Sequence, residues 1–520
     1  MVAMEELLTL SPFVTSLLAL LLVLPIIVYL LKSKDRGLPP GPPAVPIIGH
    51  LHLLRPPMHL TLHDLTTRYG PLIQLRLGSS LCIATGSVDM AREVLKTHET
   101  SFLERPSTVA ARHFAYETAG FAFAPYGEYW RFVKRLCMSE LLGPRTLEQL
   151  RPIRQSEVTG LLRTLLDKSQ TGEAVNLSKE LIKLTNNVIT RMVASNTAGD
   201  DAEVSRQVVK QVAEVMGTFN VGDYISFLRG FDVQGLNKKI REVHQNFDNL
   251  LEGFITAKEK ARSAATARGG EAKERPVKDL LDILLDVAED PKAEVKITRE
   301  NIKGFVLDIF TAGTDSSAAT IEWALSELIN HPRIMQKLQE EIDRVIGTDR
   351  LVGEADVPNL PYLNAVVKEI MRIHPGAPIA YRMSTQETTI GGYNIPANAT
   401  VAVNLYSTGR DPKYWADPDT FRPERFFEES NVKLDVKGLH YQLIPFGGGR
   451  RVCPGVGFAL QVVPAGLAAL VQCFDWKISE GTADENGRLN MEEGDGGLVS
   501  YRVNPLVLVP IRRLDPFPLI

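Results

Sequence analysis

The residues best suited to chemistry surround one cysteine near the C-terminal end of the chain. Five of them form the pattern Phe-x-x-Gly-x-Arg-x-Cys-x-Gly, namely Phe446, Gly449, Arg451, Cys453 and Gly455. The apolar run 456–473 that follows predicts a helix. Unpaired N–H groups and the positive end of the helix dipole favour an anionic sulfur there, so we expect Cys453 to ionise more easily than a free thiol. Such a thiolate is prepared to bind a metal.

The neighbours of the cysteine suit a flat, metal-containing ligand. The glycine run 447–449 lets the backbone approach such a ligand without a Cβ in the way. Phe446 can cover the sulfur from water, and Arg451 can pair with a carboxylate. The alternative is that Cys453 is a small buried hydrophobe, which is the usual place of a free cysteine. The surrounding spacing favours the metal ligand.

The stretch 445–455 resembles the haem-binding signature of the cytochrome P450 superfamily, in which a Cys thiolate is the axial ligand of the iron. The resemblance implies haem b bound through Cys453, with Phe446 and Arg451 beside it. A thiolate ligand pushes electron density onto the iron and favours O–O cleavage, which oxygen insertion requires.

A second polar group lies inside a long helical segment. Thr298 can cap this helix, which runs without a proline until Pro332. Gly313 costs about 1 kcal/mol relative to Ala in a helix interior, which indicates that something needs space there. Small residues share one face at i, i+4 spacing: Ala312, Ser316 and Thr320. A flat cofactor can lie against that face.

The stretch 312–317 resembles the Ala-Gly-x-Asp-Thr motif with which the family activates oxygen. The resemblance implies a proton relay in which Asp315 is the acid and Ser316 the alcohol. Ser316 stands where Thr is commoner and lacks the methyl group that stiffens χ1, so proton delivery would be less tightly held. Without the cysteine motif, Asp followed by Ser in a helix is more often solvated surface.

Two further motifs imply structural support for the cysteine. Glu369 and Arg372 are i, i+3 neighbours on a predicted helix 363–373, where they would ordinarily form a surface ion pair of little energy. Pro-Glu-Arg-Phe follows at 423–426, and the spacing resembles the family's Glu-x-x-Arg and Pro-Glu-Arg-Phe pair. The resemblance implies that Arg425 completes a buried triad that fixes the segment presenting Cys453.

Other contacts to haem are also carried over from the family. A Trp-x-x-x-Arg pattern contacts the haem propionates there, and Trp130 is followed here by Lys134 at the Arg position. Lys is a point charge rather than a planar fork, so this is a departure. The alternative is a buried Trp beside a solvated basic face. Arg382 occupies a place where relatives use Arg for a propionate.

The elements that position these residues are mainly helical. The 520 residues are 44% hydrophobic with a net charge of −4, so the chain can bury a large core and gives no reason to expect nucleic acid as a partner. We predict a hairpin of strands 72–77 and 81–85, an exposed or disordered loop at 258–278 and a strand at 501–510. Residues 101–127 are either a loop over a ligand or an ordinary connector. The fold class is mainly α with small β-sheets, and the resemblance implies the cytochrome P450 fold.

The N-terminal end differs from the rest of the chain. Residues 12–31 form an uncharged run about long enough to span a bilayer, and Lys32, Lys34 and Arg36 follow it. We predict a membrane anchor with a basic flank at 1–37, a proline-rich hinge at 38–45 and one catalytic domain at 46–520. The positive flank should keep that domain in the cytosol on a single-pass anchor, and the resemblance implies the endoplasmic reticulum. The alternative is a cleaved secretory signal.

The cysteines give no reason to expect an oxidising compartment. The four of them are widely scattered, at Cys82, Cys137, Cys453 and Cys473. Their spacing suggests neither a disulfide framework nor a zinc site, so a reducing compartment fits best.

The reaction implied by the family is an NADPH- and O₂-dependent monooxygenation. Electrons would come from NADPH-cytochrome P450 reductase docked near Cys453, with Lys134, Arg135 and Arg450 as candidate contacts. The alternatives from other classes are a haem protein that does not activate O₂, against which Asp315 and Ser316 argue, and a membrane-anchored scaffold without haem.

The substrate implied is a small hydrophobic molecule. The stretches 121–127, 409–415 and 442–446 resemble plant enzymes such as flavone synthase II, flavanone 2-hydroxylase and isoflavone synthase. A flavanone, oxidised by 2-hydroxylation or by desaturation to a flavone, is therefore the expected substrate. The alternative is a triterpenoid methyl group of the β-amyrin type. Contacts would come from Phe305, Ile309 and Ala312 and from the loop 377–380.

Overall fold

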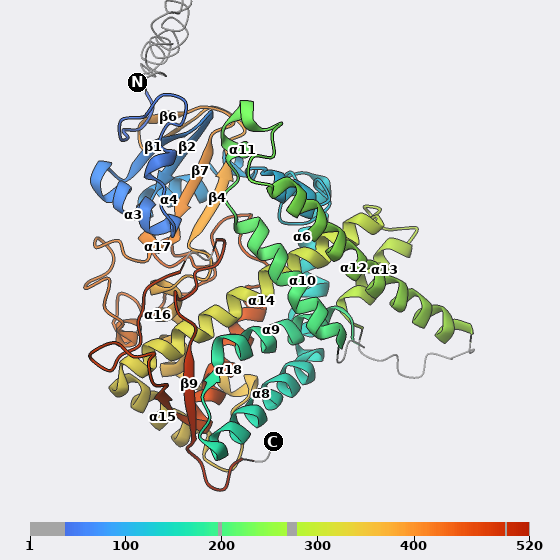
Figure 1. The fold of residues 1–520 in the computed structure, drawn as a ribbon, viewed down its shortest axis with the longest axis vertical. Coiled ribbons are helices and arrows are strands. Elements are labelled where there is room, and N and C mark those ends of the chain that lie inside the picture. Colours follow the sequence, from blue (N-terminus) through green and yellow to red (C-terminus); the bar gives the residue numbers. More distant parts are fainter. Residues whose placement is uncertain (1–36, 196–199, 268–277, 495–496, 519–520) are drawn as a thin grey trace, which may run out of the picture.

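The computed structural model describes residues 37–195, 200–267, 278–494 and 497–518, and most of the elements in these ranges are helical (Figure 1). The predicted membrane span 12–31 lies outside the described residues. The α-helices are α3 (Met58–Tyr69), α4 (Val88–Arg92), α5 (Val109–Phe114), α6 (Glu128–Leu136), α7 (Pro144–Gln149), α8 (Arg151–Thr171), α9 (Leu177–Val193), α10 (Asp200–Gly217), α11 (Val221–Tyr224), α12 (Leu236–Ala267), α13 (Leu280–Glu289), α14 (Arg299–Asn330), α15 (Pro332–Ile346), α16 (Pro361–Ile373), α17 (Leu405–Thr408) and α18 (Val456–Cys473).

The strands form three small sheets. They are β1 (Leu72–Leu77), β2 (Ser80–Thr85), β3 (Val175–Asn176), β4 (Ile379–Met383), β5 (Thr388–Ile390), β6 (Tyr393–Ile395), β7 (Thr400–Asn404), β8 (Phe474–Ile478) and β9 (Val507–Arg512). The largest sheet has the order β1-β2-β7-β4, the second β3-β9-β8, and the third pairs β5 with β6. The predicted class, mainly α with small sheets, is confirmed.

The predicted hairpin is also confirmed. β1 pairs with β2 in antiparallel register, with Leu72 opposite Thr85 and Leu77 opposite Ser80. β2 then pairs in parallel with β7, although more than 300 residues separate them in the chain. This long-range pairing brings Arg382, on the neighbouring β4, into the same sheet as the N-terminal hairpin.

The central element is α14, which crosses the middle of the molecule in Figure 1 and packs against α9 and α18. Thr298 caps it as predicted, because its side chain accepts the N–H of Asn301 while Asn301 accepts the N–H of Thr298. A Cβ on Gly313 would lie 2.7 Å from Cδ1 of Ile189 on α9. The space at Gly313 therefore serves the close crossing of two helices.

Helix α18 begins and ends where the apolar run predicts, at Val456–Cys473. It is apolar and long enough to cross a membrane, yet 78% of it is buried inside the fold. The run of apolar residues is thus explained by its place in the core, directly behind the cysteine segment.

Two local predictions are wrong in part. The charged segment expected as a loop from 258 is helical to Ala267, because α12 continues and Lys258 pairs with both Asp279 and Asp282. Residues 268–277 lie outside the described residues. The strand expected from 501 begins only at Val507, since residue 502 forms no more than an isolated bridge with Glu493. Segment 101–127 contains the short helix α5.

Candidate active site

The cysteine segment 445–455 is a tight turn ahead of α18. Its backbone closes on itself, because the N–H of Cys453 donates to the carbonyl of Phe446 at 3.0 Å. Gly447 and Gly449 have φ of 73° and 70°, which favours glycine. A Cβ on Gly449 would also lie 2.3 Å from the carbonyl oxygen of Leu95. The segment can adopt this path only with glycine at that position.

The thiol of Cys453 does not ionise as easily as predicted. Burial raises its pKa, although the N–H of Gly455 and the charges of Lys134 and Arg105 act in the opposite direction. Desolvation of the thiolate thus outweighs the helix N-terminus, and the prediction is wrong for the polypeptide alone. A metal cation bound at Cys453 would supply the missing positive charge, since a coordinating thiol is deprotonated.

Four cationic side chains gather around the cysteine segment from four parts of the chain: Arg105, Lys134, Arg382 and Arg451. Most of their hydrogen bonds reach backbone oxygens: Lys134 Nζ donates to Val452 at 2.8 Å, and Arg451 donates to Leu103 and Ala124 at 2.8 and 2.7 Å. Within the described ranges, none of the four forms an ion pair. Burial, together with repulsion from neighbouring arginines, lowers the pKa of Arg382 to about 9.

Some donors of this cluster have no hydrogen-bond acceptor among the described residues. Buried donors without a partner are Nε of Arg105, Nη1 of Arg451 and Nε1 of Trp130. Asp308, an acid whose charge acts on Arg105, accepts a backbone N–H from Ala122. Unpaired donors on cationic side chains are costly to leave inside a protein, so these residues suit an anionic ligand. A flat group that carries two carboxylates and a metal for Cys453, such as haem, fits these residues.

The sequence did not single out Arg105. It lies in the aperiodic stretch 101–127, and no local pattern distinguishes it from a surface arginine. The structure places it beside Arg382, Arg451 and Cys453, as their mutual electrostatic effects show. Arg382 and Arg451 also line one small pocket together with Leu95 and Gly448.

The central helix is accessible over only a short stretch. Ala312 is exposed and Ser316 is half-buried, whereas most residues from 314 to 328 are buried. The hydroxyl of Ser316 donates to the carbonyl of Ala312 at 2.7 Å. A Cβ on Gly376 would lie 3.5 Å from Cβ of Ser316. The predicted small face is therefore partly accessible, and Gly376 packs against it beside Ser316.

Asp315 lies on a different face from Ser316. Its carboxyl is buried and accepts a hydrogen bond from the hydroxyl of Tyr501, in the C-terminal segment. Burial raises the pKa of Asp315, and the bond from Tyr501 and the charge of Lys210 only partly oppose this. The structure thus pairs the acid with Tyr501, which the sequence did not single out, and leaves the Ser316 hydroxyl on the accessible face.

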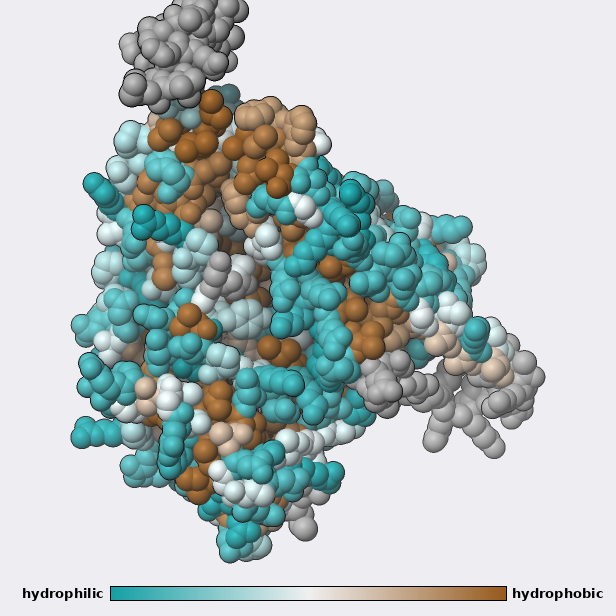
Figure 2. All heavy atoms as spheres, in the orientation of Figure 1, coloured by the Kyte–Doolittle hydropathy of each residue, from teal (hydrophilic) through white to brown (hydrophobic). Residues whose placement is uncertain are grey.

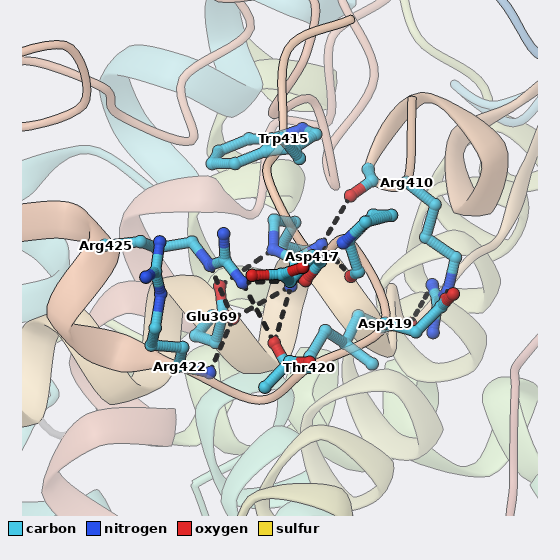
Figure 3. A network of polar contacts seen from close by, with 12 residues as sticks. Glu369, Arg410, Trp415, Asp417, Asp419, Thr420, Arg422 and Arg425 are labelled. Carbon is cyan, nitrogen blue, oxygen red and sulfur yellow. Dashed lines mark hydrogen bonds and ion pairs between the residues drawn. The ribbon is translucent and has the colours of Figure 1, made fainter. Parts of the chain in front are cut away.

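The three residues of the structural triad are in contact (Figure 3). Oε2 and Oε1 of Glu369 accept Nε and Nη2 of Arg372, both at 2.8 Å, and Oε1 accepts Nε of Arg425 at 2.9 Å. All three side chains are almost fully buried. Oε1 also accepts the backbone N–H of Arg422 at 2.9 Å.

The triad holds the segment that leads to the cysteine. Arg372 donates to the carbonyls of Gly409 and Pro418, and Arg425 donates to that of Ala416. The ring of Trp415 packs against both guanidinium groups, with its centroid 5.1 Å from Cζ of Arg372 and 5.9 Å from Cζ of Arg425. Its indole N–H donates to the carbonyl of Gln442 at 3.2 Å, three residues before the cysteine segment. The contacts therefore run continuously from the triad to that segment.

The predicted substrate residues lie along one part of α14. Phe305 is buried, 6.5 Å from the ring of Phe121, and Ile309 is partly buried beside the accessible stretch. Asp308 stands between them, although the sequence analysis did not select it. Its signal in the sequence is a single charge within the apolar run 304–310.

Comparisons with known proteins agree with this geometry. The family model "Cytochrome P450" matches residues 39–499. The chain is 52% identical to cytochrome P450 93G1 of Oryza sativa subsp. japonica, over 93% of this chain and 92% of that protein. It is 43% identical to the beta-amyrin 24-hydroxylase of Glycine max, over 94% of each chain. It is 41% identical to the 2-hydroxyisoflavanone synthase of Glycyrrhiza echinata, over 96% of this chain and 98% of that protein.

Among solved structures, a zebra fish cytochrome P450 determined with progesterone is similar. It has a TM-score of 0.72 and 27% sequence identity, and the match covers 88% of this chain and 100% of that one.

Proposed function

Because the chain belongs to the cytochrome P450 family, we propose that this plant-type monooxygenase oxidises a flavanone with electrons from NADPH-cytochrome P450 reductase. The observation that carries the proposal is the set of cations around Cys453, of which Arg105 and Arg451 each keep a buried donor without a protein acceptor. The family implies a haem-thiolate cofactor, which would satisfy them.

Haem would be held by Cys453 through the sulfur and by Arg105, Arg382 and Arg451 through its carboxylates. When bound, it supplies the activation of O₂ for insertion into a carbon–hydrogen bond. Lys134 donates inward to Val452, which favours a role beside the cofactor over a role in docking. Trp130 stacks on Phe121 at 5.6 Å, lies 4.6 Å from Arg451 and has a buried N–H without a partner. Phe446 and Ala312 would contact the two faces of the ring.

We assign proton delivery to the paired residues of the central helix. The Ser316 hydroxyl donates to the carbonyl of Ala312 and lies on the accessible face of the helix. It can donate a proton to a group on that face and be reprotonated by water. Asp315 is the proton donor of the relay, because burial raises the pKa of its carboxyl and the hydrogen bond from Tyr501 orients it. Since the two side chains lie on different faces, ordered water must connect them.

The substrate proposal rests on the relatives and on an apolar wall. Phe305, Ile309 and Ala312 lie on α14 and would contact the ring system of a flavanone, together with residues 377–380, of which the last two begin strand β4. The name of one relative, 2-hydroxyisoflavanone synthase, supports a flavonoid. The name of another, beta-amyrin 24-hydroxylase, supports a triterpenoid methyl group as the second candidate.

Turnover in microsomes that contain reductase tests both candidates. We expect naringenin to give a 2-hydroxylated or desaturated product and β-amyrin to give none. A hydroxylated β-amyrin alone would replace the first candidate by the second. The 450 nm band of the reduced carbon monoxide complex is measured in the same sample, and its absence would contradict a haem-thiolate protein and leave a scaffold without haem.

Contact with the endoplasmic reticulum membrane is proposed from an apolar patch. Figure 2 shows brown side chains at the top of the molecule, over the start of the described chain and α11. Ile47, Phe227, Phe231 and Val233 are 63–70% exposed there. Exposed apolar patches of this kind favour a lipid surface.

The membrane contact is tested by labelling. Phe231→Cys should react with a water-soluble maleimide in microsomes more slowly than Leu439→Cys, although Leu439 is 74% exposed. Equal rates would contradict the contact.

Reductase docking is proposed for the face beside the cysteine segment, with the catalytic domain in the cytosol. Arg135 and Arg450 are exposed there and pair with Glu294 and Glu99. Exposed charges at a docking face change association rates in a salt-dependent way. Arg450→Glu should slow reduction at low salt and have less effect at high salt. A reduction rate that does not depend on salt would contradict docking by these charges.

A further inference from the structure

Two buried acids and two buried histidines form a line of polar contacts, here called the His–Glu network (His59, Glu327, His374 and Glu493). Nε2 of His374 lies 2.8 Å from Oε1 of Glu327, and Nε2 of His59 lies 2.6 Å from Oε2 of Glu493. Nδ1 of His374 has no hydrogen-bond partner among the described residues and lies 4.0 Å from Oε1 of Glu493. All four side chains are at most 10% exposed. The network therefore joins α3, α14 and the end of α16 inside the fold.

The network reaches Ser500 from the side of the central helix. The ring of His374 stacks on Trp323 of α14, with the centroids 4.0 Å apart and an interplanar angle of 3°. The indole N–H of Trp323 donates to the carbonyl of Ser500 at 3.0 Å. Glu327 binds the imidazole that covers the indole, so this acid contributes to the placement of the N–H that holds Ser500.

Glu493 holds Ser500 from a second side. The Ser500 hydroxyl donates at 2.6 Å to Oε2 of Glu493, the oxygen that also contacts His59. The backbone N–H of Ser500 donates to the carbonyl of Gly376 at 3.1 Å. The hydroxyl, the N–H and the carbonyl of this buried serine are therefore all bound, and a displacement of Ser500 breaks at least one of these bonds.

Tyr501, the next residue, extends to the acid of the proposed proton relay. Its hydroxyl donates to the carboxyl of Asp315, and its backbone carbonyl accepts the N–H of Gly494 at 2.8 Å. Burial and the charge of Asp315 raise the pKa of Tyr501, so the hydroxyl keeps its proton and remains a donor. Asp315 and Trp323 are about 12 Å apart along the axis of α14. The central helix thus contacts two consecutive residues, Ser500 and Tyr501, at two separate points.

The two acids of the network remain hydrogen-bond acceptors at neutral pH. Burial acts to raise the pKa of Glu327, but the bonds with His331 and His374 outweigh it and lower the pKa to about 2. Burial also acts to raise the pKa of Glu493, but the bond with His59 outweighs it and the pKa is lowered. Hydrogen bonds to an ionised carboxylate are stronger than those between neutral groups, so Glu493 is suited to hold the Ser500 hydroxyl in place.

We propose that Glu493 and His374 are positioning residues, which hold Ser500 and thereby place the hydroxyl of Tyr501 on the carboxyl of Asp315. This rests on the proposed function, in which Asp315 delivers protons. Among the described residues, no hydrogen bond or ion pair joins the His–Glu network to Asp315 directly. Its effect on the relay therefore passes through Ser500 and Tyr501.

The first test is a cycle of unfolding measurements that needs no turnover. Glu493→Leu removes the acceptor of Ser500, and Tyr501→Phe removes the donor to Asp315. Urea unfolding is measured for the full-length holoprotein, each variant and the double variant. The factor by which Tyr501→Phe raises the unfolding constant should be about threefold smaller in Glu493→Leu than in the natural protein, because the two residues act on one contact. Equal factors would overturn the positioning role.

The second test measures the peroxide released per NADPH with reductase and naringenin. Glu493→Leu should raise this ratio about threefold, because a displaced acid no longer delivers protons where they are needed. Glu493→Gln keeps an oxygen acceptor for Ser500 and should stay close to the natural protein. In Tyr501→Phe, which already lacks the bond to Asp315, the further change Glu493→Leu should have no effect on the ratio. All variants should keep the 450 nm band.

Smaller substitutions distinguish the positioning role from a general loss of structure. Ser500→Ala removes only the hydroxyl bound to Glu493 and should raise the peroxide ratio less than Glu493→Leu does. His59→Leu should act in the same direction as Ser500→Ala. Its matched control is His63→Leu, since His63 lies one turn further along α3 and contacts Ser407 at 2.9 Å rather than Glu493. His63→Leu should leave the ratio unchanged.

The outcomes separate this inference from the proposed function. If the natural protein shows no 450 nm band or leaves naringenin unchanged, the proposed function fails, and the unfolding cycle by itself decides whether Glu493 places Tyr501. If the natural protein is active and Glu493→Leu raises the peroxide ratio equally with and without the Tyr501 hydroxyl, the positioning role is overturned. The role is also overturned if Glu493→Gln is as severe as Glu493→Leu, or if His63→Leu acts as His59→Leu does.

Discussion

The buried acids on the two sides of the proposed haem site have different hydrogen-bond partners. On the cysteine side, both oxygens of Glu369 accept donors from Arg372, and Arg425 adds a third cationic donor. On the helix side, Asp308 and Asp315 receive neutral donors, and burial raises the pKa of each. The acid on the cysteine side is thus paired with cations of the protein, whereas the two acids on the helix side have no cation as a hydrogen-bond donor.

This difference separates structural support from chemistry. A buried carboxylate that accepts hydrogen bonds from two guanidinium groups holds the segments that carry those groups together. A buried carboxyl with neutral partners is poised closer to neutral pH, as proton transfer requires. The same comparison extends to the cations, because Arg372 and Arg425 have an acid, whereas Arg105 and Arg451 keep donors free for a ligand.

The largest expected effect concerns the proposed metal ligand itself. Cys453→Ser should abolish the 450 nm band of the reduced carbon monoxide complex, because the hydroxyl does not replace a thiolate on iron. The spectrum of purified microsomes measures this. Cys82→Ala is the control, since Cys82 is a buried thiol in β2, and it should keep the band. A 450 nm band in Cys453→Ser would refute the assignment.

The next effect tests the completeness of the cysteine side. Glu369→Ala leaves two buried guanidinium groups without an acid and should lower the free energy of unfolding by about 3–5 kcal/mol, with loss of haem. Urea unfolding and haem content measure it. Glu424→Ala removes an exposed acid paired with Lys337 and should cost at most about 1 kcal/mol. Normal haem content in Glu369→Ala would contradict the supporting role.

A smaller effect is expected on the helix side, in rate rather than in stability. Asp315→Asn should lower product formation about 100-fold and raise the peroxide released per NADPH, because a positioned acid is lost. Tyr501→Phe removes only the donor to that acid and should have a weaker effect of the same kind. Both variants should keep the 450 nm band. Unchanged coupling in Asp315→Asn would remove Asp315 from the relay.

The smallest effect is a pH dependence. The pKa of Asp308 in the folded chain, about 6, lies above its unfolded value near 3.8, so the folded state binds this proton more tightly. Its contribution to stability is full below the unfolded pKa and is lost as pH rises through 6. Relative to Asp308→Asn, the natural protein should lose about 1–2 kcal/mol of unfolding free energy between pH 5 and 8. A difference that does not change with pH would contradict the raised pKa.

The sequence by itself determined the elements with strong local signals. The cap at Thr298, the helix 456–473 and the hairpin after residue 72 follow from side chains adjacent in the chain. The cysteine and Ala-Gly-x-Asp patterns likewise indicated the family, because their residues occupy fixed spacings within single segments. The sequence misjudged the charged end of α12, where pairing with Asp279 and Asp282 across space stabilises the helix.

Only the tertiary structure decided which residues from distant segments lie beside those motifs and how deeply they are buried. Arg105 and Asp308 are unremarkable in their own segments and become important because distant parts of the chain meet beside Cys453 and Ala312. Desolvation decided in the same way that the Cys453 thiol has a raised pKa, where the helix N-terminus alone predicts a lowered one. Burial and the sum of charges depend on residues far apart in the chain, and no local pattern records them.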